Sequence, residues 1–381
     1  MMRWLQTVVL ALVLAGCSST PVRESPVDSL ADSQSGLDVS TLWSSRAGRG
    51  QNAQGDALVP AVHGENVYVV DHRGRLGAWR LSDGRQQWRM ELDRPVSGGP
   101  AVTDGLIVVG TSDGMVVGID PEDSEVIWES GVTSEVLSVP AISDQAVLVM
   151  SGDGRLFALR QDNGSRRWIY DRTIPSLLLR GTSSPVLLND LVLAGLASGR
   201  LAAVRLRDGA LAWEMDVGVA SGRSDLERMR DVDGDPVVVG SNVYVVGFQG
   251  RVLSADMDRG RTNWSRDLSS FSGLAVDDER VYVTESNGRI WALDRRTGAS
   301  VWRQDSLEGI HGSAPVVTND VVVIGDDRGR LTFLNATDGE VLARIEYESG
   351  GGISRAPVVV DGDLLVLTDQ GRLLRLSLSR P

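Results

Sequence analysis

The sequence contains one cysteine, three histidines and few aromatic residues other than tryptophan. A single thiol excludes a disulfide within the chain, so folding does not depend on one. His63, His72 and His311 do not have the spacing of metal ligands, and we expect them in turns or at the surface. The formal net charge of −13, without any basic stripe, excludes nucleic acid and an anionic membrane surface as electrostatic partners.

The N-terminal apolar stretch, residues 5–14, follows Arg3 and is too short to span a membrane. It leads into the letters LAGC, ending at Cys17, which resemble the lipobox of bacterial lipoproteins. The resemblance implies a signal peptide over residues 1–16 and an acylated Cys17 inserted in lipid. The alternative is a buried or incidental cysteine.

The residue after the cysteine is Ser18, which by the same resemblance implies sorting to the outer membrane and a location on its periplasmic face. Residues 17–37 are rich in serine, proline and aspartate and have no periodic apolar pattern, so we expect a flexible tether. The remaining residues, 38–381, are expected to form a single domain.

One unit is repeated eight times along that domain. A glycine recurs at positions 74, 114, 154, 199, 250, 288, 329 and 371. A proline lies fourteen residues before seven of these glycines, with Leu274 at the other place. A tryptophan lies fourteen residues after the first six: Trp88, Trp128, Trp168, Trp213, Trp264 and Trp302. Such a period is typical of repeat architectures.

Each copy alternates β-branched runs with glycine-containing turns, which predicts four short antiparallel strands. Four such strands cannot bury their faces alone, but copies arranged around an axis can. The sequence therefore predicts an all-β fold, an eight-bladed β-propeller. The eighth copy lacks a fourth strand, and the segment around Trp43 is expected to supply it and close the ring.

The periodic tryptophan is expected to pack between its blade and the next one. Ala343 takes this place in the seventh copy, which predicts a weaker blade there. Seven of the eight hairpin glycines are followed by arginine, and so regular a placement indicates a structural role: Arg75, Arg155, Arg200, Arg251, Arg289, Arg330 and Arg372.

The stretch from Ala292 to Trp302, with Asp294, Thr297 and Gly298 between them, resembles the tryptophan-docking repeat of quinoprotein (PQQ-type) propellers. Together with the lipobox, the tether and the eight copies, it resembles the BamB family, lipoproteins of the outer-membrane β-barrel assembly (BAM) complex. The resemblance implies a non-enzymatic scaffold that assists folding and insertion of outer-membrane proteins. Its implied partners are the POTRA domains of BamA, the BAM complex and nascent outer-membrane proteins.

Two segments carry the partner contacts that this resemblance implies: SLLLRG over 176–181 and RMRDVDGDP over 228–236. Leu177, Leu179 and Arg180 match the first, and Arg228, Asp231 and Asp233 match the second. Leu178 departs from the pattern of the family.

The connector lengths support these two segments independently. The distance from the tryptophan position of each of the first seven copies to the next first strand is 12, 12, 17, 23, 10, 13 and 14 residues, and the two longest of these connectors contain these segments. The connector from Trp43 to Pro60 also spans 17, but its residues are small and polar. Insertions in repeat proteins are often on the binding face. In an extended chain Leu177 and Leu179 share one side, and so do Asp231 and Asp233. The alternative is that the leucines plug the face or the channel of the propeller.

No catalytic motif is present. The segment DVDGDP superficially resembles a calcium loop, but its glycine comes too early and no glutamate follows at the twelfth position. We therefore expect no enzymatic activity, no cofactor and no metal. Two alternatives stay open: a degenerate PQQ-dependent dehydrogenase, and a propeller that binds cell-wall carbohydrate through exposed tryptophan.

Overall fold

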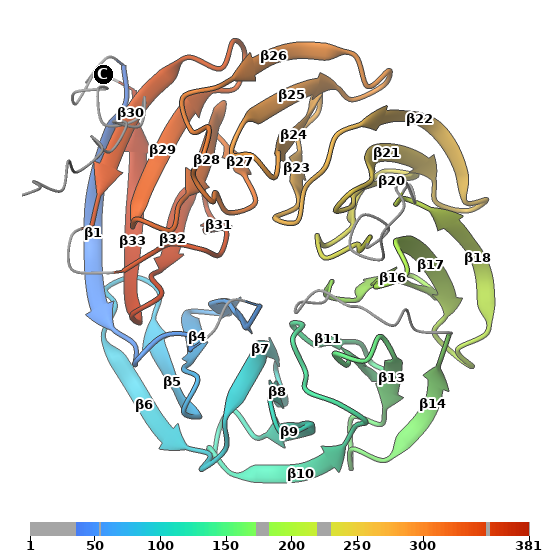
Figure 1. The fold of residues 1–381 in the computed structure, drawn as a ribbon. Coiled ribbons are helices and arrows are strands. Elements are labelled where there is room, and N and C mark those ends of the chain that lie inside the picture. Colours follow the sequence, from blue (N-terminus) through green and yellow to red (C-terminus); the bar gives the residue numbers. More distant parts are fainter. Residues whose placement is uncertain (1–35, 53–54, 173–182, 219–229, 348–350, 381) are drawn as a thin grey trace, which may run out of the picture.

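The computed structural model describes residues 36–52, 55–172, 183–218, 230–347 and 351–380. These residues form eight antiparallel sheets arranged as blades around a central axis, and no helix occurs among them (Figure 1). The predicted eight-bladed β-propeller is therefore confirmed.

The first four blades have the following strands, in order from the inner to the outer one. Blade 1 contains β3 (Ala61–His63), β4 (Asn66–Val70), β5 (Arg75–Arg80) and β6 (Gln86–Glu91). Blade 2 contains β7 (Val96–Thr103), β8 (Leu106–Thr111), β9 (Met115–Ile119) and β10 (Val126–Gly131). Blade 3 contains β11 (Ala141–Ile142), β12 (Val147–Met150), β13 (Leu156–Leu159) and β14 (Arg166–Tyr170). Blade 4 contains β15 (Val186–Leu188), β16 (Leu191–Leu196), β17 (Arg200–Arg205) and β18 (Leu211–Asp216).

The other four blades follow in the same order. Blade 5 contains β19 (Val237–Val239), β20 (Asn242–Val246), β21 (Arg251–Asp256) and β22 (Arg261–Asp267). Blade 6 contains β23 (Leu274–Val276), β24 (Arg280–Thr284), β25 (Ile290–Asp294) and β26 (Ser300–Gln304). Blade 7 contains β27 (Val316–Thr318), β28 (Val321–Gly325), β29 (Arg330–Asn335) and β30 (Val341–Glu346). Blade 8 contains β31 (Val358–Val360), β32 (Asp363–Leu367), β33 (Arg372–Ser379) and β1 (Asp38–Arg46).

The N-terminal strand closes the ring, as predicted. β1 pairs antiparallel with β33 from Asp38 opposite Ser379 to Arg46 opposite Arg372, and Trp43 lies opposite Arg375. A further two-residue strand, β2 (Ala57–Leu58), adds in parallel to the inner edge of β7 and has no equivalent in the other described blades.

Blade interfaces contain the hydrophobic core, with one buried cluster at each of the eight junctions. The tryptophans pack there as predicted. The Trp213 Nε1 donates a hydrogen bond to the carbonyl of Met257 in blade 5, 2.7 Å away. Its ring covers Gly260, whose φ of +60° and ring contact leave no space for a Cβ atom. The same hydrogen bond recurs for Trp43, Trp128, Trp168, Trp264 and Trp302.

In the outer strand pair of blade 7, the large residue lies on the third strand and the small residue on the fourth, which is the reverse of blade 4. In blade 4 a small residue, Ala203, lies opposite the tryptophan, whereas in blade 7 Phe333 lies opposite Ala343. Phe333 is fully buried in the cluster between blades 7 and 8. The phenylalanine ring compensates for the missing indole, so the expectation of a weak blade has no support in the packing.

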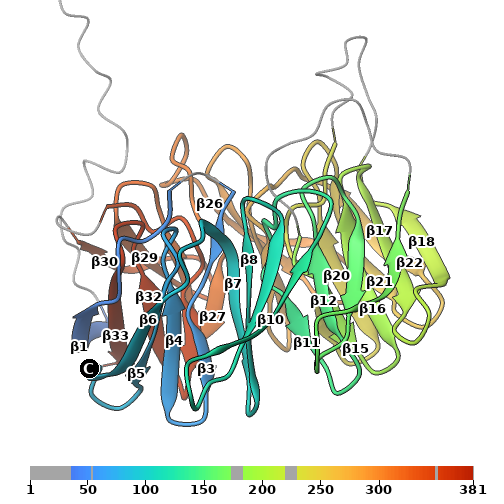
Figure 2. The same ribbon diagram turned by 90° about the horizontal axis from the view of Figure 1, so that it is seen from below.

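Strands run between the two faces of the disc (Figure 2). The connectors between blades and the turns between second and third strands lie on one face, the connector face. Four of the seven hairpin arginines, Arg75, Arg155, Arg200 and Arg289, pair with carboxylates across the outer strands, which supports the predicted structural role. Arg75 lies 3.4 Å from Glu91, Arg200 lies 3.0 Å from Asp216, and Arg289 lies 3.5 Å from Asp305.

Candidate functional site

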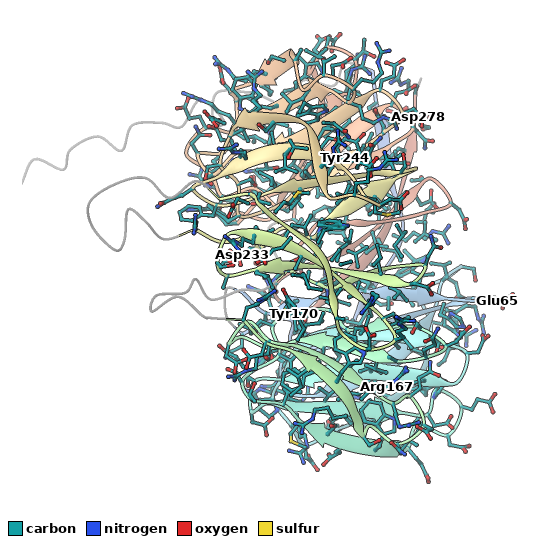
Figure 3. All side chains as sticks on the ribbon, turned by 90° about the vertical axis from the view of Figure 1, so that its right-hand side faces the viewer. Glu65, Arg167, Tyr170, Asp233, Tyr244 and Asp278 are labelled. Carbon is teal, nitrogen blue, oxygen red and sulfur yellow. The ribbon has the colours of Figure 1, made fainter. Side chains whose placement is uncertain are left out.

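The two longest connectors, on either side of blade 4, start and end on the connector face. Figure 3 shows Tyr170 and Asp233, which flank them, on this face, with Glu65 and Asp278 on the other. Of the predicted site residues, Asp231 and Asp233 lie within the described chain. The others lie outside the described residues: Cys17, Leu177, Leu179, Arg180 and Arg228.

The described ends of the two connectors are joined to each other. The backbone N–H of Ser184, at the end of the first connector, donates to the Asp235 carboxylate at the end of the second, 2.5 Å away. The Ser184 hydroxyl accepts a hydrogen bond from the backbone N–H of Val139 in blade 3. The two connectors therefore meet on one shared base that spans blades 3 to 5.

The second connector is also tied to the hairpins of blades 4 and 5. At its start, the backbone N–H of Gly218 donates to the Gly199 carbonyl, 2.7 Å away. At its end, the backbone N–H of Phe248 donates to the Asp231 carbonyl, 2.8 Å away. Gly195 in β16 permits this arrangement, because a Cβ atom there would lie 2.4 Å from the carbonyl oxygen of Val232.

Three carboxylates follow one another at the end of the second connector. Asp231 is only 3% exposed, and its Oδ1 accepts the N–H of Val232. Burial, followed by the charge of nearby Asp233, raises the pKa of Asp231 to about 8. Burial also raises the pKa of Asp233, whose Oδ1 is buried and has no hydrogen-bond partner among the described residues. The effect of the Asp233 charge on Asp231 is consistent with the expected placement of the two side chains on one side of the segment.

The Asp231 side chain is thus buried within the base formed by the ends of the two connectors. Because it is buried, Asp231 is better placed to stabilise the second connector than to contact a partner directly, as the sequence predicts. Asp233 is half-buried and Asp235 keeps an exposed surface, although surrounding protein raises the pKa of Asp235 as well.

The positive charge of Arg355 opposes the rise in the pKa of Asp233 and Asp235. Its guanidinium donates from both Nε and Nη2 to the backbone carbonyl of Asp56, ahead of β2. Burial lowers the pKa of Arg355, and the charges of Asp235, Asp56, Asp369 and Asp233 oppose that shift. Several carboxyl groups thus surround one arginine on this part of the connector face.

The first connector starts beside a row of alternating charges. Arg172 donates from Nε to the Tyr170 hydroxyl, 2.9 Å away, and its guanidinium lies 5.4 Å from the centre of that ring. Arg200 lies 3.3 Å from Glu214 and 3.0 Å from Asp216. Exposed pairs of this kind contribute little to stability, but they orient the side chains at the base of the connector.

Replacing Asp231 with asparagine tests its protonation. A carboxyl whose folded pKa lies above its unfolded pKa contributes stability below the unfolded value, and this stability is lost as the pH rises through the folded value. The asparagine side chain does not titrate, so the variant lacks this pH-dependent contribution to stability. We expect the free energy of unfolding of Asp231→Asn, relative to wild type, to rise by about 1–3 kcal/mol between pH 5 and pH 8 in denaturant titrations.

The control for this experiment is Asp208→Asn in the turn of blade 4. Asp208 is exposed, and its hydrogen bond from the Ala210 N–H lowers its pKa. This variant should show no gain with rising pH. If Asp231→Asn behaves in the same way, the raised pKa is wrong.

Three observations on the described residues bear on the cofactor and carbohydrate alternatives. No group of three or more His, Cys, Asp or Glu side chains among them could hold a metal ion. The large apolar residues exposed in the described chain include no tryptophan; Trp79 is buried, and Trp291 packs beneath the guanidinium groups of Arg266 and Arg303. A search of the same residues for helices long and apolar enough to cross a membrane finds none.

Sequence reasoning missed Arg355, Asp235 and Tyr170. A comparison of the repeats could have found Arg355, because it stands two residues before the first-strand proline. Small residues such as Ser138, Gly234 and Ser313 occupy that place in most other copies. Tyr170 and Asp235 carry no comparable signal in the repeat.

The fold and the tryptophan docking define the class of this protein as a PQQ-like repeat propeller. Quinohemoprotein alcohol dehydrogenase ADHIIG of Pseudomonas putida HK5 has this fold, with a TM-score of 0.71 at 13% identity over 89% of this chain and 76% of that one. The crystal structure of BamB from Moraxella catarrhalis matches with a TM-score of 0.82 at 24% identity, over 89% of this chain and 100% of that one.

The model of the family described as outer membrane protein assembly factor BamB matches residues 31–95, 80–304 and 288–379. The assembly factor BamB of Alkalilimnicola ehrlichii is 41% identical over 377 residues, which cover 99% of this chain and 97% of that protein. The chain belongs to the BamB family, whose members are named as assembly factors. It is a non-enzymatic member of the propeller class and not a dehydrogenase.

Proposed function

We propose that this chain is a scaffold of the BAM complex that docks on the POTRA region of BamA through its connector face and assists insertion of outer-membrane β-barrel proteins. Family membership supports the assembly role. The observation that supports the docking site is the hydrogen bond between Ser184 and Asp235, which joins the ends of the two longest connectors in one base.

The chemistry of this base suits a partner with basic and apolar groups. Asp233 has a buried oxygen that finds no hydrogen-bond partner in the part of the chain that the structure describes, and the guanidinium of Arg355 already donates to the Asp56 carbonyl. A basic side chain of the partner would compensate the remaining negative charge. Leu177 and Leu179 would supply the apolar contacts, with Arg180 and Arg228 as charged neighbours; this division resembles a small binding hot spot. Asp231 would hold the base in place.

We further propose that residues 1–16 are a signal peptide and that acylated Cys17 and the tether 17–37 hold the propeller on the periplasmic face of the outer membrane. Two or more acyl chains anchor a protein more firmly than one. The propeller 38–381 would then orient the POTRA domains without performing chemistry.

A pull-down from solubilised outer membranes tests the docking site. The double variant Leu177→Ala/Arg180→Ala and the single variant Asp233→Asn should each reduce recovery of the barrel subunit, the double variant by at least about tenfold. Leu211→Ala, at an exposed position on β18, is the matched control and should leave recovery unchanged. Unchanged recovery with the double variant would refute the docking site.

A further inference from the structure

Phe271 is the one aromatic residue among the large apolar side chains that are exposed in the described chain, and it is 36% exposed. The others lie in strands, whereas Phe271 lies in the connector between β22 and β23, on the connector face. Other apolar side chains of this connector and the next one turn inward, since Leu268, Leu307 and Ile310 are buried. The exposure of Phe271 is therefore not a general property of these connectors.

Hydrogen bonds fix the backbone on which Phe271 stands. The hydroxyl of Ser270, a buried residue, accepts the backbone N–H groups of Ser272 and Gly273, each 3.2 Å away. The Ser272 hydroxyl donates to the carbonyl of Gly312 in the next connector, 2.7 Å away. The phenyl ring thus stands on a fixed turn, and a preorganised side chain loses little conformational entropy when a partner covers it.

Phe271 is the middle ring of a row that crosses three blades. Its ring centre lies 6.2 Å from that of Phe248, in the turn between β20 and β21, and 6.4 Å from that of His311, in the connector between β26 and β27. The Nδ1 of His311 lies 3.1 Å from the Asp327 carboxylate, which orients the imidazole. We call Phe248, Phe271 and His311 the aromatic row. Aromatic side chains are enriched in the cores of protein interfaces.

The aromatic row begins at the base of the proposed docking site. The backbone N–H of Phe248 donates to the Asp231 carbonyl, 2.8 Å away. The connectors that lead into blades 5 and 6 also touch, because a Cβ atom at Gly234 would lie 2.8 Å from the Cα atom of Gly273. The proposed docking surface and the aromatic row are therefore continuous on the connector face.

Asp233 and Phe271 occupy equivalent places in neighbouring connectors, since each stands three residues before the first-strand position of its copy. In the other described connectors a small or buried residue takes that place: Ala57, Ser97, Leu137, Gly312 or Ser354. A partner that reaches Asp233 therefore meets Phe271 at the next equivalent place around the ring.

On the basis of the proposed docking of BamA at the connector face, we infer that the aromatic row extends this docking surface over blades 5 to 7, with Phe271 as its anchor. The occupant is an apolar or aromatic side chain of the same partner, which packs on Phe271 while a neighbouring basic side chain pairs with Asp233. An aromatic anchor beside a charged pair is typical of a binding hot spot. A second copy of this chain fits less well, because it would bring like carboxylates together.

A pull-down from solubilised outer membranes tests Phe271. Phe271→Ser removes the ring, and we expect recovery of the barrel subunit to fall by at least about tenfold. Phe271→Tyr keeps the ring and should recover the subunit as wild type does. Val301→Ser, at a 47% exposed position on β26, is the matched control and should also recover it as wild type does. Thermal unfolding of the three variants should match wild type, because both side chains are exposed.

Photocrosslinking in intact cells provides a second readout that does not depend on a loss of binding. We expect p-benzoylphenylalanine in place of Phe271 to crosslink to the barrel subunit. The same residue in place of Glu65, on the other face, should not (Figure 3). A crosslink from position 271 only to a second copy of this chain, or only to another protein, would overturn the inference.

The double variant Leu177→Ala/Arg180→Ala, measured in parallel, separates this result from the proposed docking site. Wild-type recovery with Phe271→Ser overturns the inference, and if the double variant still loses recovery, the docking site around blade 4 stands without the aromatic row. If only Phe271→Ser loses recovery, the aromatic row is the contact and the docking site around blade 4 is wrong. If neither loses recovery, both are wrong.

Discussion

Replacing Trp213 with alanine is expected to lower the free energy of unfolding by about 3–5 kcal/mol. The indole packs in the cluster between blades 4 and 5, covers Gly260 and donates to the Met257 carbonyl. Alanine removes these contacts and leaves a void, because Gly260 has no side chain that could fill it. Unfolding by urea, followed by tryptophan fluorescence and circular dichroism, measures the change.

Trp213→Phe separates the two contributions of the indole. The phenyl ring keeps much of the packing on Gly260 but cannot donate to Met257, so we expect a loss of about 1 kcal/mol more than packing alone would cause. A loss below about 1 kcal/mol for the alanine variant would contradict the wedge between blades.

Removing β1 is the second large expected effect. A chain that starts at Ala47 leaves β33 without its partner and loses Trp43, whose Nε1 donates to Leu81 of blade 1. We expect a loss of at least about 5 kcal/mol in the free energy of unfolding, or aggregation through the free edge of β33. Thermal unfolding measured at several protein concentrations distinguishes these two outcomes.

A chain that starts at Gly36 is the matched control, since it keeps all of β1. It should unfold as the longer chain does. A synthetic peptide that spans β1 should restore the stability of the chain starting at Ala47 when added in excess. Equal stability of the two truncated chains would show that the ring does not need its N-terminal strand.

The ring was predictable because it depends on spacing. Glycine, proline and tryptophan recur at constant distances, and each requires the same local geometry in every blade. The absence of a tryptophan at the end of the eighth copy, together with Trp43 near the start of the chain, was enough to predict the closing strand.

The base of the candidate site was predictable only in part, because it depends on how connectors from distant blades meet on the connector face. Asp231 and Asp233 could be placed on one side of an extended segment. The burial of Asp231 depends on its pairing with Phe248, and the position of Arg355 depends on the Asp56 carbonyl ahead of β2. A two-residue strand such as β2 has no periodicity from which it could be predicted.

The closing strand also determines how the ring carries a mechanical load. The described chain begins at Gly36, and Asp38 lies opposite Ser379 at the end of β33. A pull on the chain ahead of Gly36, directed along β1, strains all the pairs from Asp38 to Arg46 together, because strands drawn past each other share the force. Pulling the same strand sideways would break the pairs one after another at a lower force. Tension directed along β1 would therefore act on the seam of blade 8 in its stronger direction.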